Sequence, residues 1–156
     1  MKDLQLTQSP VAKAEMLIRK PVEEVFEAFV NPEITSRFWF TKSSGRLESG
    51  KRVQWDWEMY GASVQVEVKA IEEDKRILIE FGDTNVEWIF APRDSSTTFV
   101  SITNTGFAGD GDEVVRQAIE SAEAFALVLA GLKAFLEHNI TLNLVADRFP
   151  QGLEGP

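Results

Sequence analysis

The chain contains no cysteine and only one histidine in 156 residues. The absence of cysteine excludes disulfide bonds, thiol catalysis and cysteine-based metal sites. The single histidine, His138, lies near the end of a predicted helix, where a positive charge is favoured. We expect His138 to be a solvated surface residue, and no serine is placed beside it for a catalytic triad. The sequence therefore predicts no metal site, no cofactor and no catalytic residue.

Long apolar runs and a basic charge excess are also missing. No stretch reaches the ~20 apolar residues of a membrane span, and the N-terminus lacks the apolar core of a secretion signal. Twenty-five acidic residues against sixteen basic ones give a formal charge of −9, which repels nucleic acid and anionic lipid surfaces. The glycine-rich segment 106–111 lacks the Lys-Ser/Thr pair of a phosphate loop. We expect a cytoplasmic protein with no nucleic-acid partner.

The large side chains that are present favour burial. Eleven phenylalanines and four tryptophans stand against one tyrosine, so few aromatic rings carry a hydroxyl that needs a partner. A chain of this length forms a sizeable core without cross-links. No repeat or linker divides it. We predict one domain over residues 1–156, with a core at about 13–139, a leader over 1–11 and a tail over 141–156.

A long helix is predicted over residues 112–139, which contain no proline and one glycine. Its apolar residues recur at intervals of three and four, so one face should be buried. These residues are Val115, Ala118, Ile119, Ala122, Phe125, Leu129, Leu132 and Leu136. The alanines at the N-terminal end either allow close approach to a sheet or leave room for a cavity, and the helix alone does not decide between the two.

The rest of the chain predicts two short helices and six strands. The helices are expected from Pro21 to Asn31 and over 32–38, because Asn31 precedes a proline. Alternating apolar and polar residues predict strands over 13–19, 53–59, 64–70, 76–81, 86–90 and 97–105. Consecutive strands followed by a helix favour an α+β fold with an antiparallel sheet, curled around the long helix.

The candidate binding residues lie on the inner face of this sheet and on the helix. Trp55 and Trp57 should share a face with Trp88 and Phe90 from a neighbouring strand. Opposite the helix alanines they would line an apolar chamber, although each ring singly is also consistent with plain core packing. The complete set is Arg37, Trp39, Trp55, Trp57, Trp88, Phe90, Asn104, Ala118, Ala122 and Phe125.

Few polar residues could orient a ligand in this chamber, as is usual for apolar sites. Asn104 shares a face with apolar residues by alternation, but it also lies at a strand end, where exposure is common. Arg37 precedes two aromatic residues and lies either at the entrance or on the surface. The acids of the strands alternate against the apolar face and should be solvated; a register shift of one residue would turn them inward and favour an acid–base enzyme.

Several motifs together resemble the START-like (SRPBCC) superfamily, in the branch named for the activator of Hsp90 ATPase. The first are the apolar pattern Val22, Val25, Phe26 and Phe29, then Asn31-Pro32-Glu33 and Arg37-Phe38-Trp39-Phe40. Glu48-Ser49-Gly50, the strand from Thr98 to Phe107 and the helix end from Leu129 to Glu137 continue the resemblance. Two departures are Ser49, where a second glycine is common, and Phe125-Ala126, where a Gly-Trp pair is frequent.

The resemblance implies a helix-grip fold, in which a curved antiparallel sheet wraps around the C-terminal helix and leaves a cavity. We therefore expect binding of a small apolar or aromatic molecule, such as a lipid, polyketide or flavonoid-like compound, between helix and sheet. A cyclase or hydrolase using the same cavity is the first alternative. A protein-interaction module with a chaperone partner is the second, and the sequence does not decide whether the chain forms a homodimer.

Overall fold

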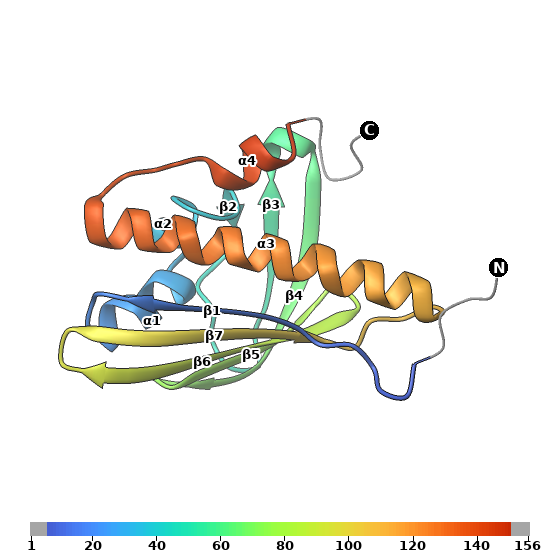
Figure 1. Cartoon of the computed structure of the whole chain (residues 1–156). Helices are drawn as coiled ribbons and strands as arrows, with labels where there is room; N and C mark the ends of the chain where they lie inside the picture. Colours follow the sequence, from blue (N-terminus) through green and yellow to red (C-terminus); the bar gives the residue numbers. More distant parts are fainter. Residues whose placement is uncertain (1–5, 151–156) are drawn as a thin grey trace.

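The computed structural model describes residues 6–150 and has one seven-stranded sheet, one long helix and shorter helices around them (Figure 1). The expected leader and tail lie partly outside the described residues. The helices are α1 (Val22–Val30), α2 (Pro32–Thr35), the 3-10 helix η1 (Glu58–Tyr60), α3 (Gly111–His138) and α4 (Leu144–Arg148). The strands are β1 (Ala12–Ile18), β2 (Lys42–Ser43), β3 (Arg52–Trp57), β4 (Ala62–Glu72), β5 (Arg76–Phe81), β6 (Thr84–Asp94) and β7 (Thr97–Thr105).

The sheet is antiparallel throughout, with strand order β1-β7-β6-β5-β4-β3-β2. Two glycines at positive φ allow tight turns between strands: Gly61 lies between η1 and β4, and Gly82 lies between β5 and β6. A bulge in β4 between Val68 and Ala70 bends the strand. Figure 1 shows that the sheet is curved: β3 and the upper part of β4 turn away from the direction of β6 and β7.

Helix α3 crosses the inner face of the sheet and packs along β1 (Figure 1). It begins at Asp110, whose side chain accepts a hydrogen bond from the backbone N–H of Glu113 at 2.9 Å. The α+β helix-grip prediction is confirmed. One residue of the predicted apolar face is wrong: Ile119 is 66% exposed, and Val114 is buried one turn earlier. The buried stripe is therefore rotated relative to the predicted one.

The two short helices α1 and α2 are joined at Asn31, as the Asn31-Pro32 pair predicts. The Asn31 side chain caps α2 by accepting from the backbone N–H of Glu33 at 3.1 Å. Helix α2 ends at Thr35, earlier than the predicted 38, and the Thr35 hydroxyl donates to the carbonyl of Ala28 in α1. Since α2 stops here, the aromatic residues that follow lie on an irregular segment, and Trp39 points inward from it.

Other predicted boundaries need correction. Strand β6 continues to Asp94 through the predicted turn at 91–95, with a register shift between Pro92 and Asp94. A proline fits there because a bulge needs no donor to the sheet. Met59 was expected to face inward but is exposed, since the chain leaves β3 at Trp57 and enters η1. Three short elements, β2, η1 and α4, were not predicted.

The outer face of the sheet is polar, as the alternation predicts. Its charged residues form ion pairs on the surface, including Lys69 with Glu67 at 3.6 Å and with Glu80 at 3.4 Å. Among the described residues, no helix is long and apolar enough to span a membrane.

Candidate functional site

Trp39 lies at the centre of a group of aromatic rings between α3 and the sheet. Its ring centroid is 4.8 Å from that of Trp55 and 6.3 Å from that of Trp57, both on β3. It is 6.1 Å from the ring of Trp88 on β6 and 5.6 Å from that of Phe125 on α3. We call these five residues the aromatic cluster. Residues predicted for the site from four separate elements are thus brought together.

Phe90 belongs to a neighbouring group under α1. Its ring lies 5.3 Å from Phe26 and 6.0 Å from Phe29. Phe29 in turn lies 5.7 Å from Trp88, so α1 joins this group to the aromatic cluster. Phe40 and Phe81, which were not predicted as site residues, also contact the aromatic cluster. Phe40 stacks on the Trp55 ring at 4.8 Å, and the ring of Phe81 lies 5.8 Å from that of Trp55. The sequence held a signal for each: Phe81 alternates inward with Ile77 and Ile79 on β5, and Phe40 directly follows Trp39.

The indole nitrogen of Trp88 is a buried donor without an acceptor. Trp88 is 1% exposed, and among the buried side-chain nitrogens and oxygens of the described residues its Nε1 alone has no hydrogen-bond partner. The aromatic rings around it are those of Phe29, Trp39 and Phe125, with centroids 5.7, 6.1 and 6.3 Å from that of Trp88. An unsatisfied buried donor costs about 1–3 kcal/mol. A molecule that brought an acceptor to this N–H would remove that cost.

Asn104 is buried, 4% exposed, and its amide is engaged by the protein. The two Nδ2 hydrogens go to the Thr84 hydroxyl at 2.9 Å and to the Asn85 carbonyl at 2.8 Å. Its Oδ1 accepts from the hydroxyl of Ser121 on α3 at 2.7 Å. The residue therefore links β7, β6 and α3, with one lone pair of Oδ1 remaining. Ser121 was not predicted, although it lies one helical turn from Phe125 on the same face.

The helix side of the site combines small and large residues. Ala118 and Phe125 are buried and Ala122 is half-buried. Gly131, which sequence analysis did not single out, gives the closest approach: a Cβ at this position would lie 3.2 Å from both Cβ and the carbonyl oxygen of Phe38. Glycine at this point allows α3 to press against the segment that carries Trp39.

Arg37 lies apart from the aromatic cluster. Its side chain is exposed directly after α2, while its neighbours Phe38 and Trp39 face inward. Among the described residues, its guanidinium has no hydrogen bond or ion pair, and only its backbone N–H is engaged, donating to the carbonyl of Ile34 at 2.9 Å. Its predicted place at an entrance remains a prediction.

Helix α4 lies over the upper ends of β3 and β4 (Figure 1). The Tyr60 hydroxyl at the end of η1 donates to the carbonyl of Val145 in α4 at 2.9 Å. Arg148 binds Glu123 of α3 through two hydrogen bonds, at 2.7 and 3.0 Å. Burial, followed by the charge of Asp147, raises the pKa of Tyr60. These contacts hold α4 across one end of the space between helix and sheet.

The buried polar residues in the described part of the chain are Thr35, Thr98 and Asn104. Within the same residues, no group of three or more metal-ligating side chains is placed to hold an ion, and His138 is exposed. The arrangement can enclose apolar surface and offer one N–H donor. Within residues 6–150, it brings no acid or base to the aromatic cluster.

Solved structures share this fold. The protein SSP2350 from Staphylococcus saprophyticus is 31% identical, with 85% of this chain and 96% of that one aligned and a TM-score of 0.76. The Aha1 dimer from Colwellia psychrerythraea is 16% identical over 83% of this chain and 97% of that one, at a TM-score of 0.71. The di-domain ARO/CYC BexL of the BE-7585A biosynthetic pathway is 16% identical over 82% and 46%, at 0.69.

No curated protein sequence matches the chain. A family profile does: residues 19–137 match the profile described as activator of Hsp90 ATPase homolog 1-like protein. This span runs from the end of β1 to the last turn of α3, and so contains the aromatic cluster, Asn104 and Gly131. The resemblance noted in the sequence is thereby confirmed, and the chain belongs to the activator of Hsp90 ATPase homolog 1-like family.

Proposed function

We propose that this protein binds a small apolar or aromatic molecule, of the lipid, polyketide or flavonoid-like class, between α3 and the inner face of the sheet. The observation that carries the proposal is the Trp88 indole N–H, which is buried among aromatic rings without an acceptor. A flat molecule bearing a carbonyl or ether oxygen would match both features. Its rings would contact the tryptophans, and its oxygen would accept from Trp88.

Trp39 is the side chain that would move to admit such a molecule. It lies on the irregular segment between α2 and β2, and at 9% exposure its ring is the most exposed of the aromatic cluster. The other tryptophans are on β3 and β6, which are held on both sides by neighbouring strands. Binding would bury apolar surface worth roughly 25 cal/mol per Å², less the cost of ordering both partners.

The proposal is for binding rather than turnover. The cyclase or hydrolase alternative would need an inward acid or base, and the buried polar residues of the described chain are a pair of threonines and Asn104, whose amide hydrogens are both engaged. BexL is named as an aromatase/cyclase, which supports a polyketide-like ligand class by analogy of fold only.

The protein-interaction alternative would need an exposed apolar patch on the outer face of the sheet. Among the strongly exposed large apolar residues that the structure describes, Ile89 alone lies on that face. The remainder lie before β1, on η1 and α3, or after α3: Leu6, Val11, Met59, Ile119, Ile140 and Leu142.

The test compares two probes of one shape that differ in the acceptor. Tryptophan fluorescence of the full chain would be titrated with 2-acetylnaphthalene, which has a carbonyl, and with 2-ethylnaphthalene, which has none. We expect saturable quenching by both and about two- to tenfold tighter binding of the ketone, the value of one hydrogen bond of roughly 0.5–1.5 kcal/mol.

Trp88→Phe should remove this preference, because it deletes the donor and keeps a ring. Trp57→Phe is the matched control: it makes the same change in the aromatic cluster at a nitrogen that is not an unpartnered buried donor, and should retain the preference. Absence of saturable quenching by either probe, or a preference that survives in Trp88→Phe, would contradict the proposal.

A further inference from the structure

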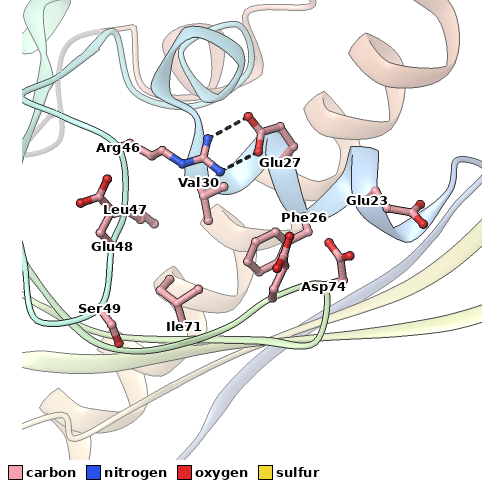
Figure 2. A pocket seen from close by; sticks show the side chains of 11 residues that line it. Glu23, Phe26, Glu27, Val30, Arg46, Leu47, Glu48, Ser49, Ile71 and Asp74 are labelled. Atoms are coloured by element: carbon pink, nitrogen blue, oxygen red, sulfur yellow. Dashed lines mark hydrogen bonds and ion pairs between the residues drawn. The ribbon is translucent and has the colours of Figure 1, made fainter.

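A hollow lies outside the aromatic cluster, between α1, the segment after β2 and the turn from β4 to β5 (Figure 2). Its volume is about 440 Å³, within the usual range of roughly 300–1,000 Å³ for small-molecule sites. None of its lining residues belongs to the aromatic cluster. Ser49, at which the chain departs from the common family pattern, lies on its lip.

The floor of this hollow is apolar. Phe26 and Val30 come from α1 and Leu47 from the segment after β2, and all three are buried; Ile71 of β4 is half-buried. Figure 2 shows Phe26 and Ile71 between the helix and the turn below it. An apolar floor in a concave site holds the body of an organic molecule, whereas a bare inorganic ion would gain nothing from it.

The walls are strongly acidic. Five carboxylates line the hollow, from Glu23, Glu27, Glu48, Glu73 and Asp74, against the single guanidinium of Arg46. Figure 2 shows that Arg46 is engaged by Glu27, through two hydrogen bonds of 2.8 Å each.

The other four carboxylates have no cationic nitrogen within 4.0 Å among the described residues. Burial, followed by the charges of Glu73 and Glu23, raises the pKa of Asp74. The hollow thus has an apolar floor and negative charge that the chain itself does not balance.

We propose that this hollow is a binding site for a small organic cation, an ammonium whose apolar body rests on Phe26 and Ile71 and whose charge lies beside Glu73 and Asp74. The apolar floor selects an organic body, and the unbalanced carboxylates select the positive charge. A metal ion is not the matching ligand, because no group of three ligating side chains in the described chain is placed to hold one. This proposal does not depend on the proposed function of the aromatic cluster.

The test uses a charged probe and its neutral isostere on the ¹⁵N-labelled full chain. Amide chemical shifts would be followed during titration with 2-phenylethylammonium and, separately, with 2-phenylethanol, which replaces the ammonium by a hydroxyl. We expect saturable shifts confined to residues 46–49, 71–74 and the adjoining face of α1. The ammonium should bind at least about fivefold more tightly than the alcohol, because it carries the positive charge that the alcohol lacks.

The variants Glu73→Gln and Asp74→Asn should each weaken ammonium binding about two- to fivefold and leave alcohol binding unchanged. Asparagine tolerates the positive φ of Asp74, 60°, so the turn is preserved. Asp83→Asn, in the exposed turn between β5 and β6, removes one carboxylate outside the hollow and should change nothing.

Three results would overturn the proposal: equal affinity for the ammonium and the alcohol, shifts that do not saturate, or unchanged ammonium affinity in a Glu73→Gln/Asp74→Asn double variant. Because the readout is local to the hollow, failure here leaves the result of the fluorescence titration at the tryptophans untouched. The two proposals can therefore fail separately.

Discussion

Asn104 shows how a polar residue can be buried on an otherwise apolar face. The alternation of β7 turns it inward beside Ile102, and it is tolerated because both amide hydrogens and one lone pair of its oxygen have protein partners. The arrangement fixes α3 to the sheet through Ser121. At this position the chain uses hydrogen bonding rather than apolar contact to set the distance between helix and sheet.

Replacing Asn104 with alanine should destabilise the protein by about 1–3 kcal/mol, because three part-buried hydrogen bonds, with Thr84, Asn85 and Ser121, would be lost. Urea unfolding followed by circular dichroism measures the change. Asn85→Ala is the control, since Asn85 contributes only its backbone carbonyl to this network and its side chain is exposed. Equal losses in the two variants would contradict the structural role of Asn104.

The ionised carboxylate of Asp74 should lower the free energy of unfolding at neutral pH. Its pKa is raised by burial and by Glu73 and Glu23, so the folded state binds its proton more tightly than the unfolded state does. The penalty on the ionised form is present at pH 7 and disappears as the pH falls through the folded-state pKa. Asp74→Asn should therefore raise the free energy of unfolding at pH 7 by less than about 1 kcal/mol, a surface-charge effect.

Thermal unfolding at pH 7 and at about pH 3, below the ordinary pKa of an aspartate, checks the sign. The gain should vanish at the lower pH, where the carboxyl is protonated in both states. Asp83→Asn should show no such gain. A loss of stability in Asp74→Asn at pH 7, or a gain of the same size at both pH values, would show that its charge carries no penalty.

At the scale of elements, the position of α3 is determined by its contacts with the sheet and with the segment that carries Trp39. Its N-terminal half is tied to the sheet through Ser121, and its C-terminal half touches the segment of Trp39 at Gly131. The contact at Gly131 is close, so the orientation of Trp39 depends on a glycine two turns from Phe125. Glycine in a helix interior is otherwise unfavourable by about 1 kcal/mol relative to alanine.

Gly131→Ala tests this contact, because two effects oppose each other. Helix propensity favours alanine by about 1 kcal/mol, and the new Cβ would lie 3.2 Å from the backbone oxygen of Phe38. Overpacking against backbone costs about 1–3 kcal/mol, so we expect a net loss of up to about 2 kcal/mol in urea unfolding.

Ala126→Gly, at an exposed position of the same helix, gives the propensity effect alone and should lose about 1 kcal/mol. If Gly131→Ala were instead more stable than the native chain, the close approach to Phe38 would not constrain the helix.

Periodicity predicted the elements wherever it ran uninterrupted. Trp55 and Trp57 on β3, and Trp88 on β6, face inward as alternation requires. It failed where the backbone changes conformation: Met59 lies beyond the end of β3 and is exposed. The prediction also failed at Ile119, which lies within the regular helix α3 but is exposed.

The parts of the site that could not be predicted depend on tertiary contacts. The hydrogen-bond partners of Asn104 come from β6 and α3, far from it in the chain, and no spacing rule pairs them. The missing partner of Trp88 is likewise a property of the packed core. The acidic hollow joins α1 to two distant loops, and in sequence its carboxylates look like ordinary solvated residues.

At the scale of the whole molecule, the two proposed sites lie in different parts of the fold. The inner face of the sheet gathers the aromatic cluster under α3, and the outer edge of α1 gathers carboxylates over an apolar floor. They share no lining residue, so an apolar ligand and an organic cation would bind without competing. Affiliation with the family is consistent with the first site, whereas the second follows from the charges of this chain alone.

The most direct test of the central claim is the indole region of a ¹H–¹⁵N spectrum recorded during titration with 2-acetylnaphthalene. Each of the four tryptophans gives one Nε1–H signal, and the Trp88→Phe spectrum assigns that of Trp88. We expect a saturable downfield shift of the Trp88 signal, because its N–H gains an acceptor. A Trp88 signal that stays in place while the ketone binds would show that no ligand acceptor reaches this N–H.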